Sequence, residues 1–174
     1  MALTIKGTGI VSTSDFHSIT WTGKTKKGNS VVITLNNAIN KGNIDWTFAE
    51  KDDVVAQIAF EGGYANTNYM VSTAGDYEEP WSISYAKGGS DTAADEIILG
   101  AGVFSIDGTD VALTRGGGQF TVEREFRDIN ADGDRGTVKD RVVMDASRAT
   151  LTLNALTFLT SMPKVFAAIS VAST

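Results

Sequence analysis

The segment GGGQFTVEREFRDINADGDRGTVKDRVVM, residues 116–144, has the pattern of two long β-strands joined by an acidic tip that contains glycine. Its first arm places Phe120, Val122 and Phe126 on one face, and most residues between them are polar or charged. This period of two is expected when one side of a sheet is buried. We therefore predict a long antiparallel hairpin.

The return arm of this hairpin places Val138, Val142 and Met144 on one face. Arg124 and Asp140 are charged residues on these otherwise apolar faces. A buried charge needs a partner or a route to water. Two interpretations stay open: both residues lie near the exposed end of the hairpin, or the hairpin projects from its domain and meets another chain.

Composition places residues 1–174 in a single domain. A chain of 174 residues fills one core and is short for two. Eighteen glycines, two prolines and many short alternating runs favour an all-β fold. We expect an antiparallel β-sandwich or barrel with a long projecting hairpin and at most one short α-helix, near Thr157–Ala168. The glycine-rich stretch Lys87–Asp95 is a candidate internal linker.

Charge and cysteine content argue against several classes of function. A net charge of −6 and a pI near 4.7 oppose the wrapping of a nucleic-acid backbone, which requires a basic surface. The absence of cysteine excludes a disulfide framework, a thiolate metal site and a thiol nucleophile. The chain has no signal-peptide pattern at its start and no apolar run of membrane-spanning length, which predicts a soluble protein made in the cytosol.

Shorter runs predict the remaining strands. Four of them pair as two hairpins: Phe16–Thr22 with Ser30–Asn36, and Asn43–Ala49 with Val54–Glu61. Val54–Glu61 is apolar at nearly every position, which is typical of a strand covered on both faces. Ile97–Leu113 predicts a tight hairpin around Asp107 and Gly108, because both central positions of such a turn favour a positive φ.

The tip of the long hairpin matches the head of a calcium-binding loop, D-x-N-x-D-G. The candidate ligands carry oxygen side chains at alternate positions: Asp128, Asn130, Asp132 and Asp134. The twelfth position, where a bidentate Glu completes such a site, is Lys139, and the flanks have strand patterns rather than helical ones. We favour a tip rich in Asx-type turns and keep these residues as weak candidates.

The sequence offers no convincing catalytic set. His17 is the only histidine, and no G-x-S-x-G element accompanies it, so a structural role is favoured. The triple glycine Gly116–Gly118 lies between strands, which predicts a bulge or bend rather than a phosphate cradle. Carboxylates such as Glu123 and Glu125 fit a solvated face, and a hydrolase with two carboxylates across a cleft is a distant alternative. We predict no enzyme activity and no cofactor.

Two segments resemble phage tail tube proteins, the major tail proteins of long-tailed bacteriophages. Gly100–Leu156 carries LGAGVFSIDGTDVALTRGGGQFTVERE, RDINADGDRGTVKDR and ATLTLNAL. Val31–Ile83 carries VVITLNNAINKGNIDWTFAEKDDVVAQIAFEGGY and EEPWSI. The two segments stand in the reverse of the order expected for that family, as in a permuted chain or a chain of two related halves.

The resemblance implies a structural protein of the virion. It implies a β-sandwich with one short helix, six copies to a ring, and stacked rings that form a conduit for DNA without sequence-specific binding. Its partners would be further copies and other tail proteins such as the tape measure and the tail terminator, without a membrane, and assembly would take place in the host cytoplasm. The long hairpin would be the chief assembly element, through Gly116, Gly117, Gly118, Glu123, Arg124, Glu125, Asp128, Asp132, Asp134, Arg135 and Asp140.

The alternative from another class is a monomeric β-sandwich binding module. It would bind calcium through Asp128–Asp134, or carbohydrate through the aromatic loop Tyr64–Trp81. A flat calorimetric titration with calcium would remove the ion-dependent version.

Overall fold

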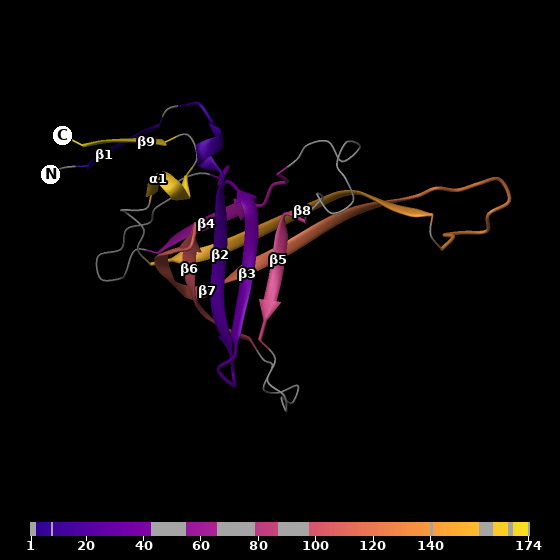
Figure 1. Ribbon diagram of the computed structural model, residues 1–174, viewed down its shortest axis with the longest axis horizontal. Helices are drawn as coiled ribbons and strands as arrows, with labels where there is room; N and C mark the ends of the chain where they lie inside the picture. Colours follow the sequence, from indigo (N-terminus) through magenta and orange to yellow (C-terminus); the bar gives the residue numbers. More distant parts are fainter. Residues whose placement is uncertain are drawn as a thin grey trace.

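The computed structural model describes residues 3–7, 9–42, 55–65, 79–86, 98–139, 141–156, 162–166 and 169–173. These residues are mostly antiparallel β-strand, as the sequence predicts (Figure 1). The strands are β1 (Leu3–Gly7), β2 (His17–Thr25), β3 (Ser30–Ala38), β4 (Ala56–Glu61), β5 (Trp81–Tyr85), β6 (Ile98–Ile106), β7 (Thr109–Asp128), β8 (Val142–Ala155) and β9 (Ile169–Ser173). A 3₁₀ turn at Thr13–Asp15 and the four-residue helix α1 (Met162–Val165) complete the described elements.

Seven strands form one sheet in the order β4-β8-β7-β6-β2-β3-β5, and this sheet curls into a half-barrel. One end of the half-barrel closes where the chain beyond β3 meets β4. Ile39 and Glu61 exchange two backbone hydrogen bonds of 3.0 Å, and the Gly63 N–H donates to the Asn36 carbonyl at 3.0 Å. The strands β1 and β9 pair with each other outside this sheet.

The core fills the concave side of the curled sheet. Its largest buried side chains come from both halves of the sheet: Ile19, Leu35, Ile58, Phe60, Phe104, Ile106 and Leu153. The rings of Phe60 on β4 and Phe104 on β6 lie 5.5 Å apart, so the two halves meet directly. Each such side chain contributes about 1.5–3 kcal/mol when it is fully buried.

Strand β4 shows where an apolar run misled the sequence analysis. Ala56, Ile58 and Phe60 are buried, whereas Gln57 and Ala59 between them are exposed. The prediction that both faces of this strand are covered is therefore wrong. The exposed positions carry small or polar residues, so the strand alternates like its neighbours.

The tight turn between β6 and β7 has the predicted form. Asp107 and Gly108 have φ values of 49° and 75°, and Ile106 pairs with Thr109 across the turn. Both φ values lie in the left-handed region that a two-residue hairpin turn requires. The first predicted hairpin is also confirmed, as β2 pairs with β3.

Some predictions fall outside the described residues. These are the strand at Asn43–Ala49 and the linker at Lys87–Asp95. The predicted short helix near Thr157–Ala168 is present as α1. In the part of the chain that the structure describes, no helix has the length and apolar character needed to cross a membrane.

Candidate functional site: the projecting hairpin

The long hairpin formed by β7 and β8 begins at a glycine bulge. Gly116 and Gly117 have φ values of 80° and 84°, which side chains rarely adopt. Across the bulge the pairing jumps from Thr114 opposite Ala155 to Gly118 opposite Leu153, so β7 has more residues than β8 at this point. The bulge predicted from the triple glycine is confirmed, and it turns β7 from its partner β6 toward its partner β8.

Beyond the bulge, the inner face of the hairpin packs on the core and then meets strand β5. Phe120 and Val122 lie against the core cluster. The ring of Trp81 on β5 contacts Phe120 edge-on, with 5.7 Å between the ring centroids. The Arg124 guanidinium lies over the same indole, 5.5 Å from its centroid, which is a cation–π contact.

This contact places Arg124 where the hairpin passes strand β5 and not near its exposed end, so it does not support the first of the two interpretations for this residue. The side chain is exposed, and its charge has a partner within its own chain. Assembly through the hairpin would therefore depend on the apolar residues beyond Arg124 and not on the charge of Arg124, which is already paired. Asp140, the other charged residue singled out, lies outside the described residues.

The distal half of the hairpin leaves the half-barrel as an arm (Figure 1). Here Phe126 lies opposite Met144 and Asp128 opposite Val142, on the continuation of the face that carries Phe120. Phe126 is 61% exposed and Val142 44% exposed. Apolar residues thus continue on this face between Arg124 and Asp128, with Phe126 and Val142 exposed and Met144 half-buried, and we call Phe126, Val142 and Met144 the inner stripe.

The other face of the arm is charged. Glu123 and Glu125 are exposed on it. Arg127 donates two hydrogen bonds to the Asp145 carboxylate, of 2.9 and 3.1 Å. This guanidinium holds the pKa of Asp145 below its ordinary value, against a smaller effect of desolvation. The pair is exposed, so it keeps the outer face hydrated and adds little stability.

Side chains of the acidic tip form hydrogen bonds within the tip. The Thr137 hydroxyl donates to Asp128 at 2.8 Å. Asp134 accepts from the Ala131 N–H at 2.7 Å and from Arg141 at 2.7 Å. Asp128 and Asp134 therefore serve as turn-stabilising acceptors, as the Asx-type interpretation predicts. The other tip residues proposed for assembly or metal binding are exposed: Asn130, Asp132 and Arg135.

The described residues contain no group of three or more metal-ligating side chains. The aromatic loop proposed for carbohydrate is described only at its ends. Trp81 there is occupied by Phe120 and Arg124, and the Tyr64 hydroxyl donates to the Ser147 carbonyl at 3.2 Å. Neither version of the binding-module alternative gains support from these contacts.

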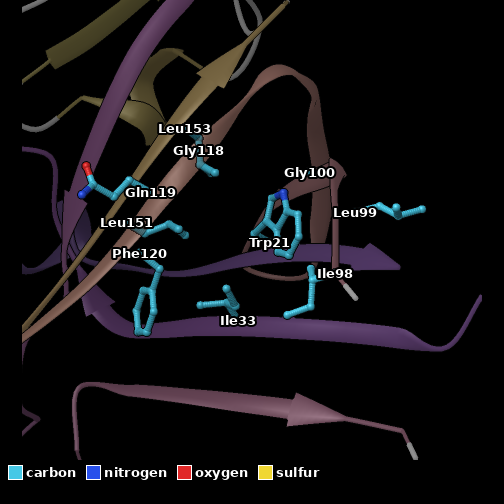
Figure 2. A pocket seen from close by; sticks show the side chains of 10 residues that line it. All are labelled: Trp21, Ile33, Ile98, Leu99, Gly100, Gly118, Gln119, Phe120, Leu151 and Leu153. Atoms are coloured by element: carbon cyan, nitrogen blue, oxygen red, sulfur yellow. The ribbon is translucent and has the colours of Figure 1, made fainter. Parts of the chain in front are cut away.

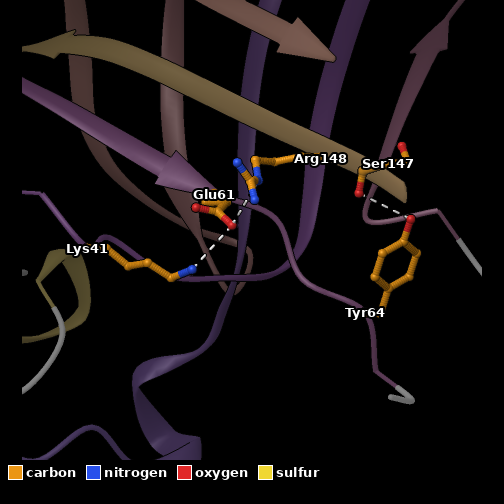
Figure 3. A network of polar contacts seen from close by, with 5 residues as sticks. All are labelled: Lys41, Glu61, Tyr64, Ser147 and Arg148. Atoms are coloured by element: carbon orange, nitrogen blue, oxygen red, sulfur yellow. Dashed lines mark hydrogen bonds and ion pairs between the residues drawn. The ribbon is translucent and has the colours of Figure 1, made fainter. Parts of the chain in front are cut away.

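A small charged cluster fixes the base of the hairpin to its neighbours (Figure 3). Glu61, at the end of β4, lies 3.2 Å from the Lys41 ammonium and 3.6 Å from the Arg148 guanidinium of β8. Arg148 stands opposite Glu123 in the β7–β8 register. The cluster joins the closing end of the half-barrel to the start of the arm.

His17 contacts the turn between β6 and β7, which suits the structural role that the sequence favours. Its Nδ1 lies 2.7 Å from the Asp107 carboxylate, which also accepts from the Ser18 N–H at 3.0 Å. Burial raises the pKa of Asp107, but the Ser18 and His17 hydrogen bonds and the nearby Lys164 charge outweigh it and leave that pKa below its ordinary value. Asp107 thus ties the β6–β7 turn to the start of β2.

The half-barrel has an apolar cavity of about 190 Å³, lined by residues of strands β2, β3, β6, β7 and β8 (Figure 2). Leu151 and Leu153 form part of its wall and are almost fully buried, whereas Ile98 and Leu99 at its rim are 54% and 46% exposed. Ile33, Phe120 and Trp21 also line it.

Sequence analysis missed this cavity. The Trp21 indole lies against Gly23 on its own strand and Gly102 on the neighbouring strand, which are paired with each other. A glycine two places after a tryptophan in a strand is a signal of such close packing. The second glycine can be matched to it only once the pairing of β2 with β6 is known.

Comparison of the chain with protein-family models, with curated proteins and with solved structures finds no match.

Proposed function

We propose that this chain is a phage tail tube subunit, which acts by self-assembly and without catalysis. The resemblance of Gly100–Leu156 and Val31–Ile83 to tail tube proteins supports the proposal. In the tube, copies would form stacked rings, six to a ring, as the virion's conduit for DNA. The tape measure and the tail terminator would be further partners.

The observation that carries the proposal is the arm with its exposed inner stripe. Phe126 and Val142 are 61% and 44% exposed, on a face that is buried where the same strands cross the body of the molecule. Exposed apolar surface of this kind marks sites of protein association. A second copy of the chain is the partner that a self-assembling subunit always has at hand.

The charge of the chain suits a conduit. A net charge of −6 repels DNA overall, and the exposed carboxylates Glu123 and Glu125 stand on the arm itself. Like charges along a bore keep DNA from adhering to the wall.

The test is direct observation of the assembled state. Sedimentation velocity and negative-stain electron microscopy over a wide range of concentration and salt should show rings or tubes. Monomers under every condition would contradict the proposal.

A pair of neighbouring substitutions locates the contact. Val142→Asn makes the inner stripe more polar and should weaken assembly, whereas Val143→Asn, on the opposite face of β8, should leave it nearly unchanged. Both valines are exposed, at 44% and 36%, so neither change creates a cavity in the core. If Val143→Asn alone weakens assembly, the outer face and not the inner stripe is the interface.

A further inference from the structure

The apolar cavity of the half-barrel has the size of one aromatic side chain. Its volume is about 190 Å³, and apolar residues form most of its lining. An apolar cavity of roughly 150 Å³ is enough to hold benzene. Sites for drug-sized molecules are larger, about 300–1,000 Å³. A single phenyl ring therefore suits this cavity better than a lipid or a cofactor.

Two phenylalanine rings among the described residues are exposed enough to be donated to a partner. Phe126 is 61% exposed and stands on the arm, away from the body of the molecule. Phe16 is 42% exposed and directly precedes β2 on the body itself. Only Phe126 is presented on an extension that reaches beyond its own core.

Phe126 does not reach the cavity of its own chain. Phe120 lines that cavity and lies on the same strand as Phe126. The two residues are roughly 20 Å apart along β7, at about 3.4 Å per residue. Only another copy can bring a Phe126 ring to this cavity.

We propose that Phe126 of one copy inserts into the cavity of a second copy, between Trp21, Ile33 and Leu99. The inference rests on the proposed function and deepens it by naming the contact. The exposed rim residues Ile98 and Leu99 would then cover part of the inner stripe around Phe126. Ring and cavity are different surfaces of one chain, so the contact runs head to tail and generates rings or filaments.

Two variants test this contact from its two sides. Phe126→Ala removes the ring and leaves the cavity intact. Gly100→Phe places a ring at the wall of the cavity, because Gly100 lines the cavity and a Cβ added there meets no atom within 4 Å. Phe16→Ala is the control, since it removes the other exposed ring.

Each variant alone should raise the dissociation constant of assembly by about 30-fold or more, as loss of a central aromatic anchor does. Phe16→Ala should assemble like the unaltered chain. In an equimolar mixture of the two variants, the Phe126 ring of Gly100→Phe can still insert into the intact cavity of Phe126→Ala. Each mixed pair can therefore form one contact. Sedimentation velocity of the mixture should show dimers and no larger species.

Toluene provides a readout that does not depend on assembly. It should raise the thermal unfolding midpoint of Phe126→Ala, whose cavity is vacant, and leave that of Gly100→Phe unchanged. Circular dichroism establishes that both variants are folded.

The contact is refuted if the unaltered chain assembles and Phe126→Ala or Gly100→Phe assembles equally well, and the proposed function would survive that result. Failure of toluene to stabilise Phe126→Ala also refutes it, because the cavity would then not accept a ring. A chain that stays monomeric at all concentrations refutes the contact and the proposed function together.

Discussion

Gly100 and Gly102 are two residues apart on β6, yet only Gly100 has room for a side chain. A Cβ at Gly102 would lie 2.8 Å from the Thr22 carbonyl oxygen and would also collide with the Trp21 indole, whereas one at Gly100 meets nothing within 4 Å. Whether a side chain fits at a glycine of this sheet thus depends on the neighbouring strand and not on the glycine's own backbone conformation.

Gly102→Ala should therefore lower the free energy of unfolding by about 1–3 kcal/mol, the usual cost of overpacking. Gly100→Ala is the matched control and should change it by less than about 0.5 kcal/mol. Urea titration followed by tryptophan fluorescence measures both. Equal effects of the two changes would mean that the Trp21 ring moves aside without cost.

Asp107→Asn should make stability less dependent on pH at the acid end. The pKa of Asp107 lies below its ordinary value of 3.8 in the folded chain, so its carboxylate stabilises the fold above that pH and loses this contribution as the pH falls through the lowered value. The variant should therefore lose more free energy of unfolding at pH 6 than at pH 2.5. This loss should stay below about 1 kcal/mol, because the Asp107 side chain is 44% exposed.

Urea titrations at the two pH values measure this difference. Asparagine tolerates the left-handed backbone at this position, where φ is 49°, so the substitution removes the charge and keeps the turn. A stability difference that is the same at both pH values would show that the carboxylate charge is not what stabilises the turn.

At the scale of the element, β7 and β8 form a hairpin whose two halves have different roles. No described residue from 126 to 145 belongs to the core cluster, whereas Phe120 and Val122 pack against it. The proximal half is part of the half-barrel, and the distal half is an arm attached to it.

A shortened chain tests that division. Replacing residues 126–145 by Asn-Gly would join Glu125 to Ala146, which already face each other across the hairpin, by a two-residue turn. The free energy of unfolding should change by less than about 1 kcal/mol, because the core is untouched, while sedimentation velocity should show monomers only. A broad, poorly cooperative unfolding transition would show that the arm belongs to the core.

Local rules predicted much of this hairpin from the sequence. Alternation identified the buried face around Phe120, and the triple glycine identified the bulge. The Asp107-Gly108 pair identified the turn that precedes the hairpin, between β6 and β7. Each of these features depends on neighbouring residues only. The cation–π contact of Arg124 with Trp81 and the pairing of Ile39 with Glu61 could not be predicted, because they join segments that the curl of the sheet brings together.

At the scale of the whole molecule, the proposed function predicts that DNA does not adhere to the protein. The net charge of −6 opposes the approach of DNA phosphates. We expect no change in the fluorescence anisotropy of labelled double-stranded DNA when the protein is added at about 50 mM salt, a condition that favours electrostatic binding. Saturable binding at micromolar protein would argue against a conduit that DNA passes without adhering.

The cavity is a property of the curled sheet as a whole. Its lining comes from β2, β3, β6, β7 and β8, and no single one of these strands reveals it. Sequence patterns predicted which faces are apolar. The gap between those faces depends on how far the sheet closes, and that depends on contacts between strands distant in the chain.

The pairing of β1 with β9 brings the described ends of the chain side by side, on the side of the molecule away from the arm (Figure 1). A circular permutant with a short peptide linking the two ends, opened at the exposed loop Lys26–Gly28, would keep every strand pair of the half-barrel in place. Fluorescent proteins or affinity tags fused at either terminus would emerge together and leave the arm unobstructed.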